Sequence, residues 1–189
     1  MLNLPNLLTW LRILLIPVFA ALYYLPQGWL TLPQANHFAA LVFLVASATD
    51  WLDGYLARKL DQATAFGAFL DPVADKLMVA AALILLVQLT RVDALIALII
   101  IGREITISAL REWMASIGER KSVAVSMLGK IKTAAQMAAI LLLLYSDPLL
   151  PGFDTAQAGR WLINIAAVLT LWSMIYYLRM AWPVIRRAR

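Results

Sequence analysis

The sequence predicts an all-α integral membrane protein with six transmembrane helices; the four aspartates described below add the expectation of a polar active-site cavity among them that faces the cytoplasm. Two observations predict this class. Of the 189 residues, 63% are hydrophobic, against roughly 45–50% in soluble domains, and the apolar residues form runs of about 20, the length that crosses a bilayer. Because no repeat or low-complexity segment divides the chain, residues 1–189 are expected to form a single domain.

The apolar runs lie between segments that favour turns. Allowing short interruptions, the spans are predicted, in chain order, at 4–25, 35–59, 65–90, 92–118, 124–146 and 159–183. The segments between them are rich in proline, glycine or polar residues, at 26–28, 59–62, 90–93, 118–121 and 146–159. Consecutive helices should therefore run antiparallel.

Lysine and arginine indicate which side of the membrane each connection occupies, because cytoplasmic loops are enriched in them. With the amino terminus inside, only Arg91 and Arg160 lie at the outer loops. The inner loops, the tail and the adjoining helix ends hold Arg58, Lys59, Arg120, Lys121, Arg186, Arg187 and Arg189. Both termini are thus expected in the cytoplasm. The net charge of +5 does not indicate nucleic-acid binding, because the basic residues form no soluble basic face.

Four aspartates interrupt the second and third spans near their cytoplasmic ends. Asp50 and Asp53 are three residues apart, and Asp71 and Asp75 are four apart, so each pair shares a helix face. Two antiparallel helices would turn all four carboxylates toward one space. An ionised group at bilayer depth costs roughly 2.5–3.5 kcal/mol on insertion scales, so a cation must neutralise them.

The available ligand types indicate a hard divalent ion. The chain has no cysteine and one histidine, His37, so a metal would have to bind oxygen. Mg²⁺ and Mn²⁺ prefer oxygen, and four carboxylates can hold two ions, as in phosphoryl chemistry. Gly54 and Gly67 leave room beside the acidic pairs. The alternative is that these are ordinary helix-end aspartates with glycines for packing.

This segment matches the pattern D-x2-D-G-x2-A-R-x8-G-x3-D-x3-D at every position. The matching residues are Asp50, Asp53, Gly54, Ala57, Arg58, Gly67, Asp71 and Asp75. The chain therefore resembles the CDP-alcohol phosphotransferase family. The resemblance implies a six-helix membrane enzyme, usually a homodimer, that uses a divalent metal to transfer a phosphatidyl group from a CDP-linked lipid to an alcohol, releasing CMP.

The resemblance also implies roles for the aspartates. Asp50, Asp53 and Asp71 would bind the metal ions, while Asp75 would complete the second metal site and act as general base on the acceptor hydroxyl. This division is chemically reasonable, since a phosphoanhydride needs cations on its oxygens and the attacking hydroxyl needs a proton acceptor.

Five further residues are candidates for binding the CDP portion of the lipid. Gly54, Arg58 and Thr64 lie within or beside the motif, and Asn6 and Thr9 lie in the opening segment NLPNLLTWLR, which is similar to that of the family. For Asn6 and Thr9, an ordinary cap and first helical turn is an equal alternative.

The acceptor is indicated by cations elsewhere in the chain. Arg103 and Arg111 lie in GREITISALREW, and Lys130 and Lys132 in GKIKTAAQ. Glutamates at 104 and 112 would balance only part of this charge, so a phosphate on the acceptor is expected to bind here. The alternative is that Arg111, Lys130 and Lys132 snorkel to the interface, whereas Arg103 is too deep in its span for that.

REITISALREW, SVAVSMLGKIKT and LTLWSMIYYL resemble bacterial family members whose acceptor is sn-glycerol 3-phosphate. The resemblance implies that CDP-diacylglycerol and sn-glycerol 3-phosphate yield phosphatidylglycerophosphate and CMP during phospholipid synthesis, among the lipids of the bacterial inner membrane and with the active site cytoplasmic. Two alternatives stay open. One is another acceptor, such as inositol phosphate, serine or choline, and the other is a divalent-cation transporter.

Overall fold

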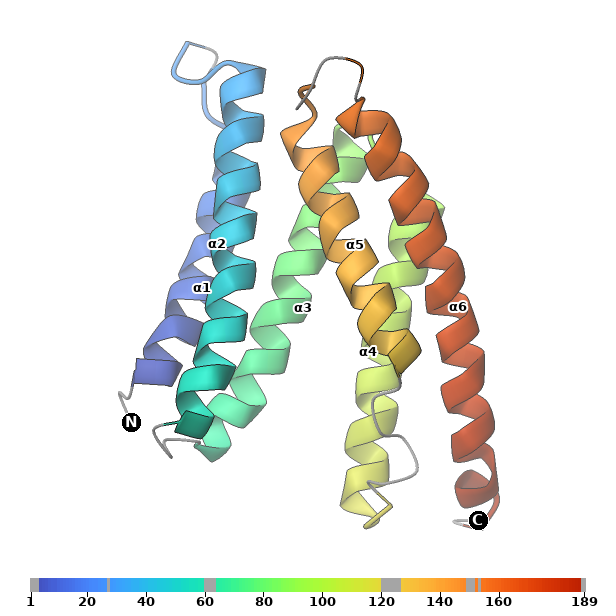
Figure 1. Ribbon diagram of the computed structural model, residues 1–189. Coiled ribbons are helices and arrows are strands. Elements are labelled where there is room, and N and C mark those ends of the chain that lie inside the picture. Colours follow the sequence, from blue (N-terminus) through green and yellow to red (C-terminus); the bar gives the residue numbers. More distant parts are fainter. Residues whose placement is uncertain are drawn as a thin grey trace.

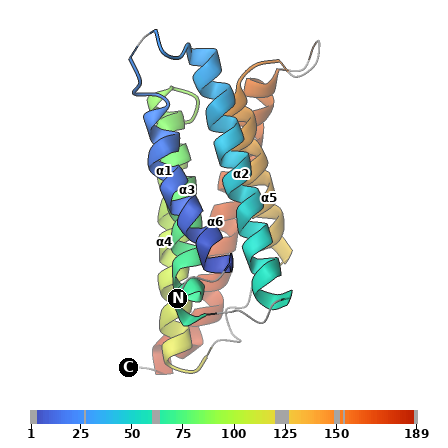
Figure 2. The ribbon, with the colours of Figure 1, turned by 90° about the vertical axis from the view of Figure 1, so that its left-hand side faces the viewer.

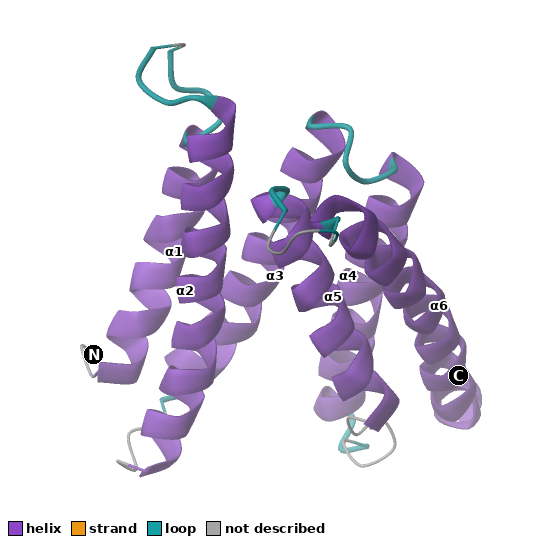
Figure 3. Ribbon diagram, turned by 45° about the horizontal axis from the view of Figure 1, so that its top comes forward, coloured by secondary structure: helices purple, strands orange, loops and turns teal. Residues whose placement is uncertain are grey.

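The structure is a computed structural model that describes residues 4–26, 28–59, 64–119, 127–148, 152 and 154–187. Within this part of the chain the regular structure is entirely α-helical, as Figure 3 shows by colour. The helices are α1 (Leu4–Ala21), α2 (Leu32–Lys59), α3 (Ala65–Gln88), α4 (Ala94–Ser116), α5 (Met127–Tyr145) and α6 (Thr155–Arg187). The all-helical class and the six predicted helices are confirmed.

The helix boundaries differ from the apolar runs by a few residues. α1 ends at Ala21, and the chain then tightens into a turn in which Tyr24 N donates to Ala21 O at 2.9 Å. α6 continues to Arg187, past the predicted end at 183, with Pro183 inside it. A proline removes one helical hydrogen bond without necessarily ending the helix, so hydropathy placed this end too early.

Local capping explains where several helices begin and end. Thr64 caps α3, its Oγ1 accepting from Gly67 N at 3.0 Å, and Asp93 caps α4, its Oδ1 accepting from Leu95 N at 2.7 Å. α4 ends in a Schellman motif, in which Glu119 N donates to Met114 O at 2.8 Å. Gly118 adopts the φ of +82° that this motif requires.

The helices form two groups, α1 to α3 and α4 to α6, which meet where α2 packs against α5 and α3 packs against α4. α1 packs against both α2 and α3, and α6 packs against both α4 and α5 (Figures 1 and 2). Figure 1 places both termini at the same end of the molecule. The largest apolar core lies toward the opposite end and includes Phe19, Phe43, Leu83, Leu86, Ile100, Ile140, Leu143 and Ile163. The aspartates therefore lie away from this core, nearer the end that carries the termini.

Hydropathy distinguishes α6 from the other helices. Among the described residues, the segment Thr155–Arg186 is, by length and composition, long and apolar enough to cross a membrane. Asn6–Ala21 and Ile131–Tyr145 are apolar but shorter. The acidic pairs lie on two other helices, α2 and α3.

Candidate active site

The structure brings the aspartate pairs of α2 and α3 together. Asp50 and Asp53 lie in the last third of α2, and Asp71 and Asp75 lie in the first half of α3. Asp53 is 3% exposed, whereas the side chains of Asp50 and Asp75 are 46% and 40% exposed. One carboxylate is thus buried in the protein, while the two more exposed ones can meet a ligand.

α1 supplies the groups that contact these carboxylates. The guanidinium of Arg12 pairs with Asp53 at 2.5 Å, with Asp50 at 3.2 Å and with Asp75. Thr9 Oγ1 donates to Asp71 Oδ1 at 2.5 Å. Arg12 and Thr9 are each 1% exposed, so α1 closes the site from the side opposite solvent.

Asn6 belongs to the same helix face as Thr9 and Arg12, at successive intervals of three residues. Thr64 Oγ1 donates to Asn6 Oδ1 at 3.1 Å. A Cβ on Gly67 would lie 2.6 Å from Asn6 Oδ1, so only glycine permits this approach between α1 and α3. The CDP-site candidates Asn6, Thr9 and Thr64 therefore border the aspartates.

Sequence reasoning missed Arg12, although a signal was present. Arg12 is a charged residue inside the apolar run 4–25. Burying an ionised group at bilayer depth costs free energy unless an opposite charge lies nearby. This predicts an anion beside Arg12, just as it predicts a cation beside the aspartates. Matching these two requirements would have paired Arg12 with the aspartates.

The predicted acceptor-binding cations form a second cluster, built on α4, α5 and α6. Arg103 is 7% exposed. Its Nη2 donates to Ser173 Oγ at 2.9 Å, and its Nη1 lies 3.4 Å from Glu104 Oε1. Lys132 is almost fully buried and pairs with the same Glu104 oxygen, so it does not snorkel. Glu104 thus serves as the counter-ion of two cations.

Arg111 is held by an aromatic ring. Its guanidinium carbon lies 5.1 Å from the centre of the Tyr177 ring, and that of Arg103 lies 5.6 Å from the same centre. Tyr177 is 1% exposed, and a cation over an aromatic face is stabilised more strongly when it is shielded from water. Tyr177 is a second residue of the site region that sequence reasoning missed, and its only signal was its place in LTLWSMIYYL.

Three predicted site positions lie outside the described side chains. Gly54 and Arg58 lie on α2, and Lys130 lies on α5, but only their helical backbone belongs to the described part of the chain.

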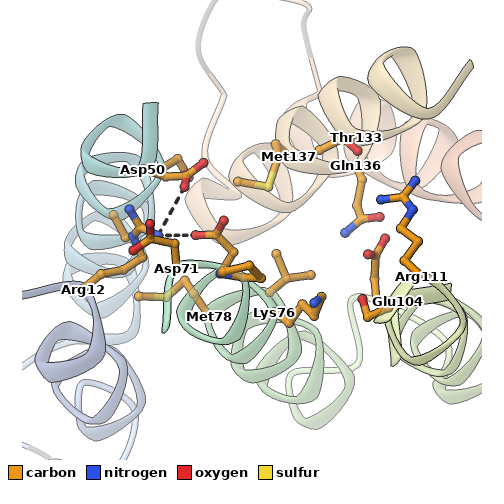
Figure 4. Close-up of a pocket in the computed structure, with 16 residues that line it drawn as sticks. Arg12, Asp50, Asp71, Lys76, Met78, Glu104, Arg111, Thr133, Gln136 and Met137 are labelled. Atoms are coloured by element: carbon orange, nitrogen blue, oxygen red, sulfur yellow. Dashed lines mark hydrogen bonds and ion pairs between the residues drawn. The ribbon is translucent and has the colours of Figure 1, made fainter. Parts of the chain in front are cut away.

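One pocket connects the acidic and basic clusters. It has a volume of about 370 Å³ and is lined by residues of α1 to α5, among them Arg12, Asp71, Asp75, Glu104 and Arg111. Figure 4 shows Arg12, Asp50 and Asp71 on one side and Glu104, Arg111 and Gln136 on the other. A molecule in this pocket would meet Asp50, Asp71 and Asp75 at one end, and Arg111 with Glu104 at the other. Arg103 and Lys132 are not among the lining residues and lie behind Glu104.

The acidic side has the chemistry of a divalent-metal site. Its donors are carboxylate oxygens, which Mg²⁺ and Mn²⁺ prefer, and they already converge on one cationic group. Among the described residues no three acidic or histidine side chains are arranged as metal ligands, and the guanidinium of Arg12 lies among the carboxylates of Asp50, Asp53 and Asp75. The type of donor, though not its present arrangement, fits a hard divalent ion.

Fold and site together define a class: an all-helical protein in which one pocket joins a carboxylate cluster to an arginine–lysine cluster. The sequence model for CDP-alcohol phosphatidyltransferase matches residues 2–172, and the chain belongs to this family. Members of the family are membrane-associated and generally depend on a divalent metal.

Two bacterial proteins, each named CDP-diacylglycerol–glycerol-3-phosphate 3-phosphatidyltransferase, are similar to the chain over nearly its whole length. The protein from Pseudomonas fluorescens is 53% identical over 188 residues, covering 96% of this chain and 91% of its own. The protein from Escherichia coli K12 is 51% identical over 181 residues, covering 95% and 94%.

Proposed function

We propose that this protein transfers the phosphatidyl group of CDP-diacylglycerol to sn-glycerol 3-phosphate, giving phosphatidylglycerophosphate and CMP in phospholipid biosynthesis. The observation that carries the proposal is the pocket that has Asp50, Asp71 and Asp75 at one end and Arg111 at the other. A phosphoanhydride fits the acidic end when metal is bound, and a phosphorylated acceptor fits the basic end. The full-length similarity to two relatives named for this reaction supports the same choice.

Asp50, Asp53, Asp71 and Asp75 are the proposed ligands for two Mg²⁺ or Mn²⁺ ions. When bound, such ions would neutralise the charge on the diphosphate oxygens and on the departing CMP. The two aspartate pairs face the same space from two helices, so together they can serve both phosphates. Arg12 contacts three of the four carboxylates, and Thr9 contacts the fourth, that of Asp71.

Asp75 is the proposed general base. It lines the pocket with Arg111 on the far side, so an acceptor whose phosphate binds Arg111 can direct its C1 hydroxyl toward Asp75. The carboxylate accepts the hydroxyl proton as the oxygen bonds to the lipid-side phosphorus. The phosphoanhydride bond then breaks, and CMP leaves with the electron pair.

The nucleotide is proposed to lie beside the amino-terminal end of α3. Asn6, Thr9 and Thr64 present buried or half-buried polar groups there, and Gly54 and Arg58 follow on α2. Arg58 would supply the positive charge that a diphosphate requires.

Arg103, Arg111, Lys130 and Lys132 are proposed to bind the acceptor phosphate. Arg103 and Lys132 share one carboxylate, Glu104, so the cluster keeps an excess of positive charge. Bidentate contacts from arginine suit a phosphate group. Serine and choline carry no phosphate and would leave this excess uncompensated.

We place the protein in the bacterial inner membrane as a single six-span domain, 1–189, that forms a homodimer. Large apolar side chains cover its outward faces, such as Leu14, Leu98 and Val168, each more than 60% exposed, and exposed apolar surface of this kind suits contact with lipid. Both termini and the pocket mouth are assigned to the cytoplasm, in accordance with the bias of lysine and arginine.

The test is a panel of acceptors assayed with purified protein, labelled CDP-diacylglycerol and Mg²⁺. We expect CMP release with sn-glycerol 3-phosphate and little with serine, choline or inositol phosphate. Turnover of serine in preference to sn-glycerol 3-phosphate would contradict the proposal. In proteoliposomes, CMP release without Mg²⁺ flux distinguishes the enzyme from a cation transporter, which would need a polar path through the core around Phe19, Phe43 and Leu86.

A further inference from the structure

Arg12 occupies the centre of the proposed metal site. It reaches there from α1 and contacts Asp50 and Asp53 on α2 and Asp75 on α3. It is 1% exposed, among the largest fully buried side chains of the described residues. Its contact with Asp53, which is 3% exposed, is thus made away from water, where an ion pair is screened least. Asp50 and Asp75 are partly open to solvent.

One guanidinium cannot neutralise four carboxylates. Even with Arg12 in place, the cluster keeps an excess of negative charge, which favours the entry of further cations. The Nε of Arg12 is buried and has no hydrogen-bond partner. The position of Arg12 is therefore set by attraction to the carboxylates, and its hydrogen-bonding capacity is not fully used.

The same oxygens cannot serve Arg12 and a metal ion equally. Arg12 contacts one oxygen of each of Asp50, Asp53 and Asp75. Mg²⁺ binds carboxylate oxygen at about 2.0–2.1 Å, so an ion held by these aspartates would lie close to the guanidinium, and two cations so close repel each other. Binding of a divalent ion therefore favours the loss of at least some of the Arg12 pairs.

Space for such a movement lies next to Arg12. Its side chain lines the pocket of about 370 Å³ that continues toward Arg111. A long arginine side chain can turn its head group while its stem stays packed. In that pocket the guanidinium would meet the anionic groups of the substrates, with which arginine forms bidentate contacts.

We propose that Arg12 is a stand-in cation: it holds the two aspartate pairs together in the metal-free protein and gives up their oxygens when a divalent ion binds. This role rests on the proposed metal site and makes Arg12 a positioning residue. It explains how a cluster of four carboxylates can remain folded within an apolar bundle before metal arrives. It also means that Arg12 and the metal ion compete for the same carboxylates. Arg12 therefore lowers the apparent affinity of the protein for Mg²⁺, and bound Mg²⁺ weakens the contacts of Arg12.

The test measures thermal stability and Mg²⁺ affinity of the purified protein in detergent, first with a chelator and then with increasing magnesium chloride. In R12M the metal-free Tm should fall by on the order of 10 °C, because the buried carboxylate of Asp53 loses its partner and the partly exposed Asp50 and Asp75 lose theirs. Mg²⁺ should then raise Tm by more than in the wild type. Its apparent Kd should fall at least about tenfold, because the competing cation has gone.

R91M is the matched control. Arg91 is also partly buried and joins several helices, but its partners are Leu143 O, Leu144 O and Asn36 Oδ1. Its Tm should fall equally with and without Mg²⁺, and its Mg²⁺ affinity should match the wild type. If R12M does not fold even with Mg²⁺, R12K decides the matter. Its single ammonium should give a Mg²⁺ affinity tighter than in the wild type.

An equal or weaker Mg²⁺ affinity in the Arg12 variants, with CMP release still dependent on Mg²⁺, would overturn the stand-in role and leave the proposed function intact. If Mg²⁺ neither stabilises the wild type nor supports its turnover, the metal site itself is wrong, and the stand-in role fails with it.

Discussion

Arg12 is fully buried and Arg91 is partly buried, near opposite ends of the bundle, and the two arginines differ in the chemistry of their partners. Arg12 contacts three carboxylates from α2 and α3. Arg91, between α3 and α4, donates to Leu143 O at 2.9 Å and Leu144 O at 3.1 Å in the last turn of α5, and to Asn36 Oδ1 at 3.0 Å. The partners of one arginine are charged, and those of the other are neutral.

The difference separates a functional contact from a structural one. Carbonyl oxygens at a helix end attract a cation through the helix dipole. They are neutral and belong to neither the proposed metal site nor the pocket, so we assign the Arg91 contacts to structure. The Asp50, Asp53 and Asp75 oxygens can bind Arg12, a metal ion or a proton. An arginine thus stabilises the bundle at one end, whereas at the other end a metal ion or a proton can replace the arginine as the partner of the carboxylates.

The largest effect on turnover is expected from D75N, which removes one carboxylate from the end of the bundle where Arg12 has charged partners. The amide cannot accept the acceptor's proton as a carboxylate can, so kcat should fall by at least about 100-fold and up to about 10,000-fold. Mg²⁺ should still raise Tm, because Asp50, Asp53 and Asp71 remain. Tm and CMP release measured on the same preparation check both points.

The control for D75N is D93N. Asp93 caps α4 at the other end of the bundle, and asparagine caps helices about as well. Turnover should be unchanged in D93N. Normal turnover in D75N would instead show that Asp75 is not the base.

A smaller effect is expected from R111M, which removes one cation from the basic side of the pocket. Hydrogen bonds to charged groups contribute roughly 1.5–3 kcal/mol, so KM for sn-glycerol 3-phosphate should rise on the order of 10- to 100-fold. KM for CDP-diacylglycerol should change little. Initial rates with each substrate varied in turn separate the two constants, and an equal rise in both would argue against an acceptor site at Arg111.

The fold was largely predictable because hydropathy depends on the sequence alone. Runs of about 20 apolar residues located all six helices, and errors were confined to ends such as Ala21 and Pro183, where hydrogen bonding decides the boundary. The convergence of Asp50 and Asp53 with Asp71 and Asp75 also followed from local spacing, because a short connection forces α2 and α3 to be antiparallel neighbours.

Local spacing could not assign partners to Arg12 and Tyr177, because their roles depend on contacts between distant segments. For Arg12 only the charge inside an apolar run gave a signal. Arg12 meets Asp53 41 residues away and Asp75 63 residues away, and nothing local states that α1 packs between these partners. Tyr177 contacts Arg103 and Arg111 across the α4–α6 interface. Helical periodicity identifies which residues share a face, but not which helix that face meets.

The smallest effect on turnover is expected from R91M, and it tests the structural side of the comparison. Loss of the guanidinium leaves the Leu143 and Leu144 carbonyls and the Asn36 side chain without this donor, at a cost of roughly 1–3 kcal/mol. For a chain of this length Tm should fall by about 5 °C, while kcat and both KM values at low temperature stay near those of the wild type.

H37Q is the control for the size of this change in Tm. The His37–Asp147 pair lies at the same end of the bundle and both side chains are well exposed, so its loss should shift Tm by less than about 2 °C. If R91M lost turnover at a temperature where it remains folded, the two ends would be coupled, and the assignment of Arg91 to structure alone would be wrong.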